Sequence, residues 1–258
     1  MKLTIGCHRS CLTAFTLIEL LVVITIIGIL AALSAVALVT AKRHAKVVIA
    51  KTQISNIEGA LIRFEAGGGK FPVSSSAEGA AAANGGSFTF GGSFTDATGA
   101  SFVIGTPGYA ANNSELMGVL TDVEKFGDGT PTINVGHVRN TTRENFLRDQ
   151  RAPGTDPSGI GDDGVYRDPW GNPYIISLNL QRESHCADAF YKRQKVSQTA
   201  AGSTAGFDGL VNSSGNANSD AFERAGKVMV WSAGPDKHAD TRMKANEGVN
   251  RDNVIGWR

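Results

Sequence analysis

An uninterrupted apolar run near the start of the chain limits what this sequence can fold into more than any other feature. Residues 20–39 carry no charged side chain and are rich in Leu, Ile and Val. A helix of this length spans roughly 30 Å, which matches the hydrocarbon core of a bilayer. A helix in a soluble core would normally keep a polar face, and this run has none. The sequence therefore predicts a membrane-spanning helix.

A glutamate stands directly before this run. Glu19 ends the segment Ala14-Phe15-Thr16-Leu17-Ile18-Glu19. A carboxylate at membrane depth costs on the order of a few kcal/mol unless it is paired or lies near the interface, so Glu19 is a functional candidate. An ordinary secretory signal has a shorter apolar core and is cut after it. Small residues around Ala35 leave that alternative, a secreted domain with a plain signal peptide, open.

The segment at the start of the run resembles the N-terminus of the type IV pilin and pseudopilin family. In that family a short basic leader and a small residue precede Phe-Thr-Leu-Ile-Glu and a long apolar helix. The leader here is residues 1–14, and Ala14 stands where most members have Gly. The resemblance implies that a prepilin peptidase cuts between Ala14 and Phe15 and methylates the new amine of Phe15. It also implies that Glu19 pairs with the N-terminal amine of a neighbouring subunit during assembly.

The positive charges around the run disagree with the orientation that the family implies. The leader carries only Lys2 and Arg9, whereas the residues after the run include Lys42, Arg43, Lys46 and Lys51. The positive-inside rule alone would place the C-terminal part in the cytoplasm. The resemblance implies a single-pass protein of the bacterial inner membrane with its head in the periplasm, and we follow the resemblance.

Beyond the run the helix is expected to continue as an amphipathic helix. Apolar residues recur three and four apart at Val47, Ala50, Ile54, Ile57, Leu61 and Phe64. The three glycines at 67–69 end the pattern. The sequence thus predicts one helix from about Phe15 to Phe64. Its residues 15–39 form a transmembrane and polymerisation segment, and residues 40–66 belong to the head.

The rest of the chain is expected to form a small antiparallel sheet packed on this helix, which makes the fold class α+β. Residues 67–163 are rich in Gly, Ser, Ala and Thr and read as a variable insertion. Within it we expect hairpins around 87–89 and 101–104, with partial disorder as the alternative, a short helix at 114–121 and a loop at 145–161. Residues 164–258 are expected to form a C-terminal β region with strands at 175–178 and 226–231.

A turn-forming block opens this C-terminal region. It consists of Asp168, Pro169, Trp170, Gly171, Asn172, Pro173 and Tyr174. From the residues alone it predicts a turn before a strand, with Trp170 anchored in the core. The block also resembles the signature of the major (G-type) pseudopilin of type II secretion. That resemblance implies a structural subunit of a periplasmic pseudopilus that drives protein secretion.

The same resemblance implies a calcium loop near the C-terminus. Carried over residue by residue, its ligands are Ser232, Asp236, Asp252 and Asn253, with Asp240 as a looser candidate. Calcium takes about six to eight oxygen ligands from carboxylates and carbonyls. The alternative is a solvated turn closed by an inward-packed Trp257.

No motif in the chain predicts an enzyme. The Gly-x-Gly-x-x-Gly pattern at 159–164 lacks the preceding strand and following helix of a dinucleotide site. A formal net charge of +1 argues against a nucleic-acid binder. Three cysteines are too few for a disulfide scaffold. We therefore expect no organic cofactor.

The expected partners follow from the resemblance. They are the membrane, further copies of the chain, prepilin peptidase, other secretion-system pseudopilins and inner-membrane assembly proteins. A surface type IV pilus for adhesion, motility or DNA uptake is the alternative assembly. A C-terminal cysteine pair would have favoured that pilus, and this chain has none.

Overall fold

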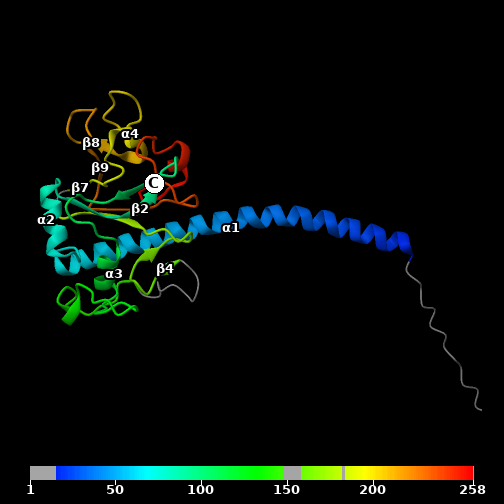
Figure 1. Ribbon diagram of the computed structural model, residues 1–258, viewed down its shortest axis with the longest axis horizontal. Helices are drawn as coiled ribbons and strands as arrows, with labels where there is room; N and C mark the ends of the chain where they lie inside the picture. The colour runs from blue at the N-terminus through cyan, green and yellow to red at the C-terminus, as the bar shows by residue number, and fades with distance from the viewer. Residues whose placement is uncertain (1–15, 148–157, 182–183, 258) are drawn as a thin grey trace, which may run out of the picture. The chain divides into compact units, whose positions relative to one another are not determined.

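The computed structural model describes residues 16–147, 158–181 and 184–257 (Figure 1). The chain divides into two compact units, Met1–Ala45 and Lys46–Arg258, and the second is called the head below. Helix α1 (Leu17–Gly68) begins in the first unit and ends in the head. It ends at Gly69, whose φ of 69° is a conformation that glycine adopts readily after a helix. The prediction of one long helix is confirmed, and the helix continues four residues beyond Phe64.

The head contains three further helices and eleven strands among its described residues. The helices are α2 (Ser75–Ala83), α3 (Ser114–Leu120) and α4 (Gln194–Ser197), and short 3-10 turns lie at η1 (Val135–His137), η2 (Phe207–Gly209) and η3 (Gly248–Asp252). The strands of the central sheet are β1 (Ser87–Phe90), β6 (Ile175–Asn179), β10 (Val228–Ser232) and β11 (Val254–Ile255). The others are β2 (Gly92–Thr95), β3 (Ser101–Ile104), β4 (Gly159–Ile160), β5 (Tyr166–Arg167), β7 (His185–Cys186), β8 (Val211–Asn212) and β9 (Phe222–Ala225).

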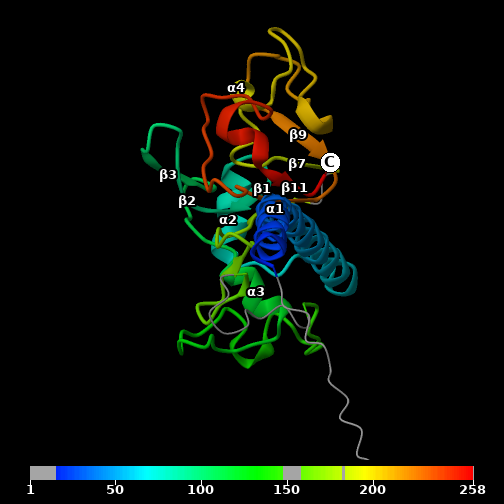
Figure 2. The ribbon, with the colours of Figure 1, turned by 90° about the vertical axis from the view of Figure 1, so that its right-hand side faces the viewer.

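The central sheet has the order β1-β6-β10-β11, and every neighbouring pair is antiparallel. Leu178 lies between Phe88 on β1 and Val228 on β10, so three apolar side chains meet on one face. Smaller sheets are the β2–β3 hairpin (Figure 2), the β4–β5 hairpin and the sheet β7-β9-β8. The α+β class with a long N-terminal helix and antiparallel sheets is confirmed.

Core residues cover both faces of the central sheet. Side chains alternate between the faces of a strand, so Val228 and Val230 join one hydrophobic cluster and Met229 and Trp231 join another. The first cluster includes the α1 residues Ala50, Ile54, Ile57 and Leu61, all at most 1% exposed. The second is formed by residues of the β2–β3 hairpin and of the chain from Ile175 to Trp257. The predicted apolar stripe of α1 is therefore confirmed as its core-facing side.

The segment 67–163 contributes more to the core than its composition suggested. The expected hairpin around 87–89 is wrong, because β1 pairs with β6 in the central sheet and its four residues are all buried. Phe88 and Phe90 pack into the first hydrophobic cluster, although the glycine-rich sequence around them did not indicate a core strand. Helix α2 was not foreseen, and Ser74 caps it by accepting the Ala77 N–H at 3.2 Å. The hairpin strand at 101–104 and the helix near 114–121 are confirmed.

The structure also differs from the sequence predictions for Trp170 and for the loop at 145–161. Trp170 is only partly buried at the edge of the first cluster, whereas Trp231 is 0% exposed and is the tryptophan at the centre of the second. Part of the loop expected at 145–161 forms β4, and much of the remainder lies outside the described residues. Trp257 packs inward with 7% exposure, as the alternative to the calcium loop predicts.

Candidate functional site

Thr16 and Glu19 form a capping box at the N-terminus of α1. The backbone N–H and the hydroxyl of Thr16 donate to Glu19 Oε2 at 2.8 and 2.6 Å, and the Glu19 N–H donates to Thr16 Oγ1 at 3.3 Å. These bonds satisfy N–H groups that lack partners in the first turn of a helix. Within one chain, Thr16 is therefore the hydrogen-bond partner of the Glu19 carboxylate, the residue that the sequence indicated as a functional candidate. Ala14 and Phe15, the predicted cleavage site, lie outside the described residues.

The N-terminal part of α1 presents apolar side chains that the chain itself does not bury. Every side chain described between Leu17 and Lys46 is exposed. Within the described part of the chain, α1 is the one helix long and apolar enough to cross a membrane. Burying one Leu or Ile side chain contributes about 1.5–3 kcal/mol, so this surface strongly favours lipid or other chains over water. It fits a single-pass membrane anchor.

The block at 168–174 folds into a buried turn around the carboxylate of Asp168. Asp168 Oδ1 accepts the backbone N–H groups of Trp170 and Asn172, both at 2.9 Å. Asp168 Oδ2 accepts the Asn172 side-chain amide at 2.8 Å and the Ser232 hydroxyl. Burial raises the pKa of Asp168 above its ordinary value, and these hydrogen bonds offset part of the rise. The carboxylate thus organises the turn rather than facing a ligand.

Gly171 and the two prolines of this turn determine the conformation of its backbone. Gly171 has a φ of 91°, which glycine adopts without the strain a side chain would add. Pro173 forms an antiparallel bridge with Arg167, which brings the chain from β5 towards β6. The carbonyl of Pro169 accepts a hydrogen bond from Lys46 Nζ at 2.9 Å. The turn therefore contacts α1 as well as the sheet.

Tyr174 and Asn172 extend these connections. The Tyr174 hydroxyl donates to Gln53 Oε1 on α1 at 2.7 Å, and burial raises the pKa of Tyr174 well above its ordinary value. The Asn172 side-chain amide donates to the Gly234 carbonyl, just beyond β10, at 2.9 Å. The block thereby fastens α1, β6 and the end of β10 to one another. Its role within the head is structural.

Asn113 is a second organising residue, which the sequence reasoning missed. Its side-chain amide donates to the carbonyls of Tyr166 and Tyr174 at 2.9 and 2.8 Å, and its Oδ1 accepts the Tyr166 N–H at 2.8 Å. Asn113 is 0% exposed. Asn113 directly precedes the short helix predicted at 114–121, and nothing in the local sequence indicates contacts with Tyr166 and Tyr174, more than 50 residues further along the chain.

The predicted calcium ligands Ser232, Asp252 and Asn253 lie on adjoining segments, and the predicted ligands take part in other contacts. Ser232 pairs with Val254, the residue after Asn253, and a Cβ on Gly234 would lie 2.3 Å from the Asp252 carbonyl. The Ser232 hydroxyl is bonded to Asp168 and accepts the Gly234 N–H at 3.0 Å. Asp236 Oδ1 accepts the His238 N–H at 2.9 Å. Ser232 and Asp236 therefore already hold partners in the chain.

The remaining oxygens do not complete a carboxylate cage. Asn253 Nδ2 donates to the Tyr191 hydroxyl at 3.1 Å, while Asn253 Oδ1 is buried and accepts no hydrogen bond. The looser candidate, Asp240, is engaged by Arg242 through Nε at 2.9 Å and Nη2 at 2.7 Å. Across residues 16–147, 158–181 and 184–257, no three His, Cys, Asp or Glu side chains gather as a metal site. Calcium binding stays a prediction.

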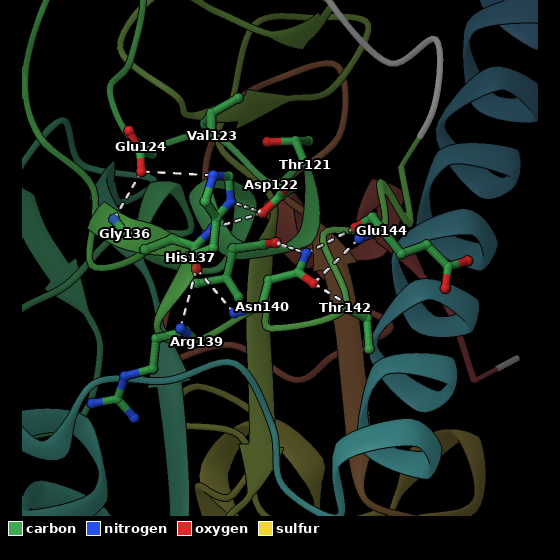
Figure 3. A network of polar contacts seen from close by, with 12 residues as sticks. Thr121, Asp122, Val123, Glu124, Gly136, His137, Arg139, Asn140, Thr142 and Glu144 are labelled. Atoms are coloured by element: carbon green, nitrogen blue, oxygen red, sulfur yellow. Dashed lines mark hydrogen bonds and ion pairs between the residues drawn. The ribbon is translucent and has the colours of Figure 1, made fainter.

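A network of polar side-chain contacts runs through the long loop after α3 (Figure 3). His137 Nδ1 lies 2.7 Å from Asp122 Oδ1, and His137 Nε2 lies 3.6 Å from Glu124 Oε1. Asp122 and His137 both have positive φ angles, 55° and 57°, which side chains rarely adopt. The Asn140 side chain donates to the Glu144 carbonyl at 2.8 Å and accepts the Thr142 hydroxyl at 3.0 Å. Side-chain contacts therefore link distant positions of this loop, and no motif in the sequence predicted this network.

Comparison with known proteins bears on the N-terminus alone. Residues 13–35 match the family model described as the prokaryotic N-terminal methylation motif. No curated protein and no solved structure matches the chain. The motif covers the predicted cleavage site, the capping box and the first turns of α1. It supports a type IV pilin-like prepilin, a structural subunit that prepilin peptidase processes and that assembles into pilin-like polymers.

Proposed function

We propose that this protein is the structural subunit of a periplasmic pseudopilus that drives type II protein secretion. The observation that carries this assignment beyond the pilin-like class is the block Asp168-Pro-Trp-Gly-Asn-Pro-Tyr174, which resembles the major pseudopilin signature. Its residues form one turn whose hydrogen bonds connect the sheet to α1. This supports the interpretation of the block as one structural motif.

Assembly on this proposal begins when prepilin peptidase cuts between Ala14 and Phe15 and methylates the new amine. In the single chain, the neutral backbone N–H and hydroxyl of Thr16 donate to the Glu19 carboxylate. The amine of Phe15 from a neighbouring copy carries a full positive charge, so it would pair the same carboxylate with an opposite charge, which Thr16 does not supply. The exchange of partners favours adding a subunit to the polymer.

The apolar surface of α1 supplies the second driving force. Its exposed side chains pass from lipid to the helices of neighbouring copies, so the polymer can grow from a membrane pool without exposing them to water. We place the anchor in the bacterial inner membrane and the head in the periplasm. A Ser213→Cys variant labelled by a membrane-impermeant maleimide in intact spheroplasts tests that orientation, and protection from the reagent until lysis contradicts it.

The proposal is tested by comparing the secreted proteins of the wild-type strain with those of a strain lacking the gene. Retention of a defined set of exoproteins in the periplasm supports the pseudopilus and identifies its substrates. An unchanged secretome with loss of a surface filament contradicts it and supports the type IV pilus instead. Complementation with the wild-type gene is the control.

A further inference from the structure

The outer edge of strand β3 is unpaired on the surface of the head. One side of β3 pairs with β2, and no strand among residues 16–147, 158–181 and 184–257 pairs with the other side. Figure 2 shows this hairpin projecting at one side of the head. Proteins commonly protect an open edge with a lysine, a proline or a bulge. The strand Ser-Phe-Val-Ile has neither a charge nor a proline, and Val103 is 65% exposed, so the edge is open to an added strand.

The hydrogen bonds of the hairpin determine which backbone groups face this edge. The Asp96 N–H donates to the Ala100 carbonyl at 2.9 Å, so these two residues form a hydrogen-bonded pair at the end of the hairpin. Bonded and non-bonded pairs alternate in antiparallel strands, so the next pair, Thr95 with Ser101, points its backbone groups away from the hairpin. In agreement, the Thr95 carbonyl accepts the Ala239 N–H at 3.2 Å on the outer side of β2. Ser101 therefore directs its N–H and carbonyl groups towards the open edge of β3.

By the same alternation, Val103 also directs its N–H and carbonyl groups towards this edge. In the described part of the chain, no backbone group bonds to Ser101 or Val103 on that side. Together the two residues offer two N–H donors and two carbonyl acceptors in the spacing of a β-ladder. An extended segment satisfies such a row when it joins the sheet as a further strand. The hydrogen-bond pattern thus indicates an occupant in the extended conformation.

A hollow of about 360 Å³ lies beside this edge. It is lined by Asp96, residues 100–103, Arg193, Thr241 and Arg242. The charge of Arg242 is balanced within the chain, because its Nη2 lies 2.7 Å from Asp96 Oδ2 and 2.7 Å from Asp240 Oδ2. Arg193 is exposed, and no carboxylate among the described residues forms an ion pair with it. The charges of the hollow therefore favour an occupant that brings a carboxylate to Arg193.

Arg193 lies on the side of the hairpin to which Phe102 points. Phe102 packs against the second hydrophobic cluster, and that cluster includes Tyr191 and Val196 from the segment that carries Arg193. Side chains directly opposite each other in a strand pair point to the same face. A side chain opposite Phe102 on an added strand would therefore point into the hollow, towards Arg193.

We propose that β3 binds an extended acidic segment of another protein as an added antiparallel strand. A glutamate or aspartate opposite Phe102 places its carboxylate beside Arg193, and a β-branched residue opposite Val103 covers that exposed side chain. The site depends on neither polymer assembly nor secretion, so it can be tested apart from the proposed function.

A peptide labelled with dansyl at its N-terminus, Ser-Val-Glu-Thr-Ser-amide, tests the proposal with the full-length chain in detergent. Its Val, Glu and Thr are placed to lie opposite Val103, Phe102 and Ser101. Fluorescence anisotropy should show saturable binding. N-methylation of the peptide at Val removes a donor to β3 and should weaken binding about tenfold. N-methylation at Glu is the matched control, because the N–H of that residue would face away from β3.

Charge reversal at Arg193 tests the side-chain contact. Arg193→Glu should weaken binding of the peptide about tenfold, because it replaces an attraction with a repulsion, and a peptide with Lys in place of Glu should then bind better than the original. Lys195→Glu is the matched control, because Lys195 is also exposed, lies on the same segment and does not line the hollow. Val103→Cys tests whether a second copy occupies the edge, because two β3 strands in contact would form a disulfide on oxidation.

Saturable binding that Val N-methylation and Arg193→Glu weaken, while both controls leave it unchanged, supports the proposal. Absence of saturable binding even at millimolar peptide overturns it, as do equal effects of the two N-methylations or of Arg193→Glu and Lys195→Glu. A Val103→Cys disulfide dimer also overturns it, because the occupant would then be a second copy of this chain. None of these results depends on whether the chain forms a polymer, so the proposed function stands or fails separately.

Discussion

The carboxylate of Asp168 accepts a hydrogen bond from the hydroxyl of Ser232, although 64 residues separate them along the chain. Both side chains are completely buried. Asp168 lies in the turn before β6, and Ser232 is the last residue of β10. One buried carboxylate therefore joins the turn to the end of the neighbouring strand.

Replacing Asp168 with alanine should destabilise the head. The change leaves the Ser232 hydroxyl and the N–H groups of Trp170 and Asn172 without their acceptor in a buried site. Such losses cost about 1–3 kcal/mol each when the group stays buried, and relaxation leads us to expect about 2–4 kcal/mol in total. Thermal unfolding measures this effect as a fall in Tm of roughly 5–15 °C.

Asp163→Ala is the control for that experiment. Asp163 forms a partly exposed ion pair with Arg167, so its loss should cost no more than about 1 kcal/mol. Equal losses of stability in the two variants would contradict the stabilising role of the buried Asp168 carboxylate.

Asn113→Ala should also lower the stability of the head. It removes one acceptor and two donors that bridge the backbones of Tyr166 and Tyr174. We expect a loss of about 2–4 kcal/mol in the free energy of unfolding, measured with denaturant. Its neighbour Asn112 is exposed and accepts only from Ser114, so Asn112→Ala should cost about 1 kcal/mol or less. If the order of the two effects were reversed, the bridging role would be wrong.

Glu19→Ala should separate processing from assembly. Cleavage between Ala14 and Phe15 should continue, because the peptide bond that is cut lies outside the capping box, while polymer formation should fall sharply without the carboxylate. Mass spectrometry of the N-terminus and quantification of sheared polymers measure the two steps. Thr16→Ser keeps a capping hydroxyl and serves as the control. Normal polymers from Glu19→Ala would refute the pairing with the amine.

Acid should destabilise the head through Asp240. Hydrogen bonding from Arg242 holds the pKa of Asp240 at about 2, below its ordinary value. The native carboxylate binds a proton more weakly than the unfolded one, so its stabilising effect is present above about pH 4 and is lost as the pH falls through about 2. We expect a loss of about 1–2 kcal/mol, reduced by screening because Arg242 is 54% exposed. Unfolding curves of the wild type and Asp240→Asn between pH 4 and pH 2 measure it, and identical slopes would contradict it.

Calcium should raise the melting temperature of the full-length chain in detergent if the predicted loop binds it. The oxygen that favours this is Asn253 Oδ1, which is buried and accepts no hydrogen bond. Chelation should lower the melting temperature, and Asp236→Ala and Asn253→Ala should each abolish the difference. A melting curve that neither chelator nor added calcium moves would remove the site.

The parts of the fold that the sequence predicted are those in which residues close in the chain act together. The spacing from Val47 to Phe64 predicted the core side of α1, and the apolar runs predicted β6 and β10. The turn at 168–174 was foreseen from its glycine and prolines. In contrast, the prediction for β1 was wrong because its partner β6 lies far along the chain and its flanks are rich in glycine.

The sequence by itself determined the membrane-length helix, the prepilin motif and the position of the buried turn, because each depends on the spacing of residues within one segment. Only the tertiary structure decided which partners the polar side chains take. Thr16 holds Glu19, Asp168 receives Ser232, Asn113 bridges two tyrosine backbones, and Asp122 faces His137. A buried polar group must find a hydrogen-bond partner, but which partner lies within reach depends on how distant segments pack.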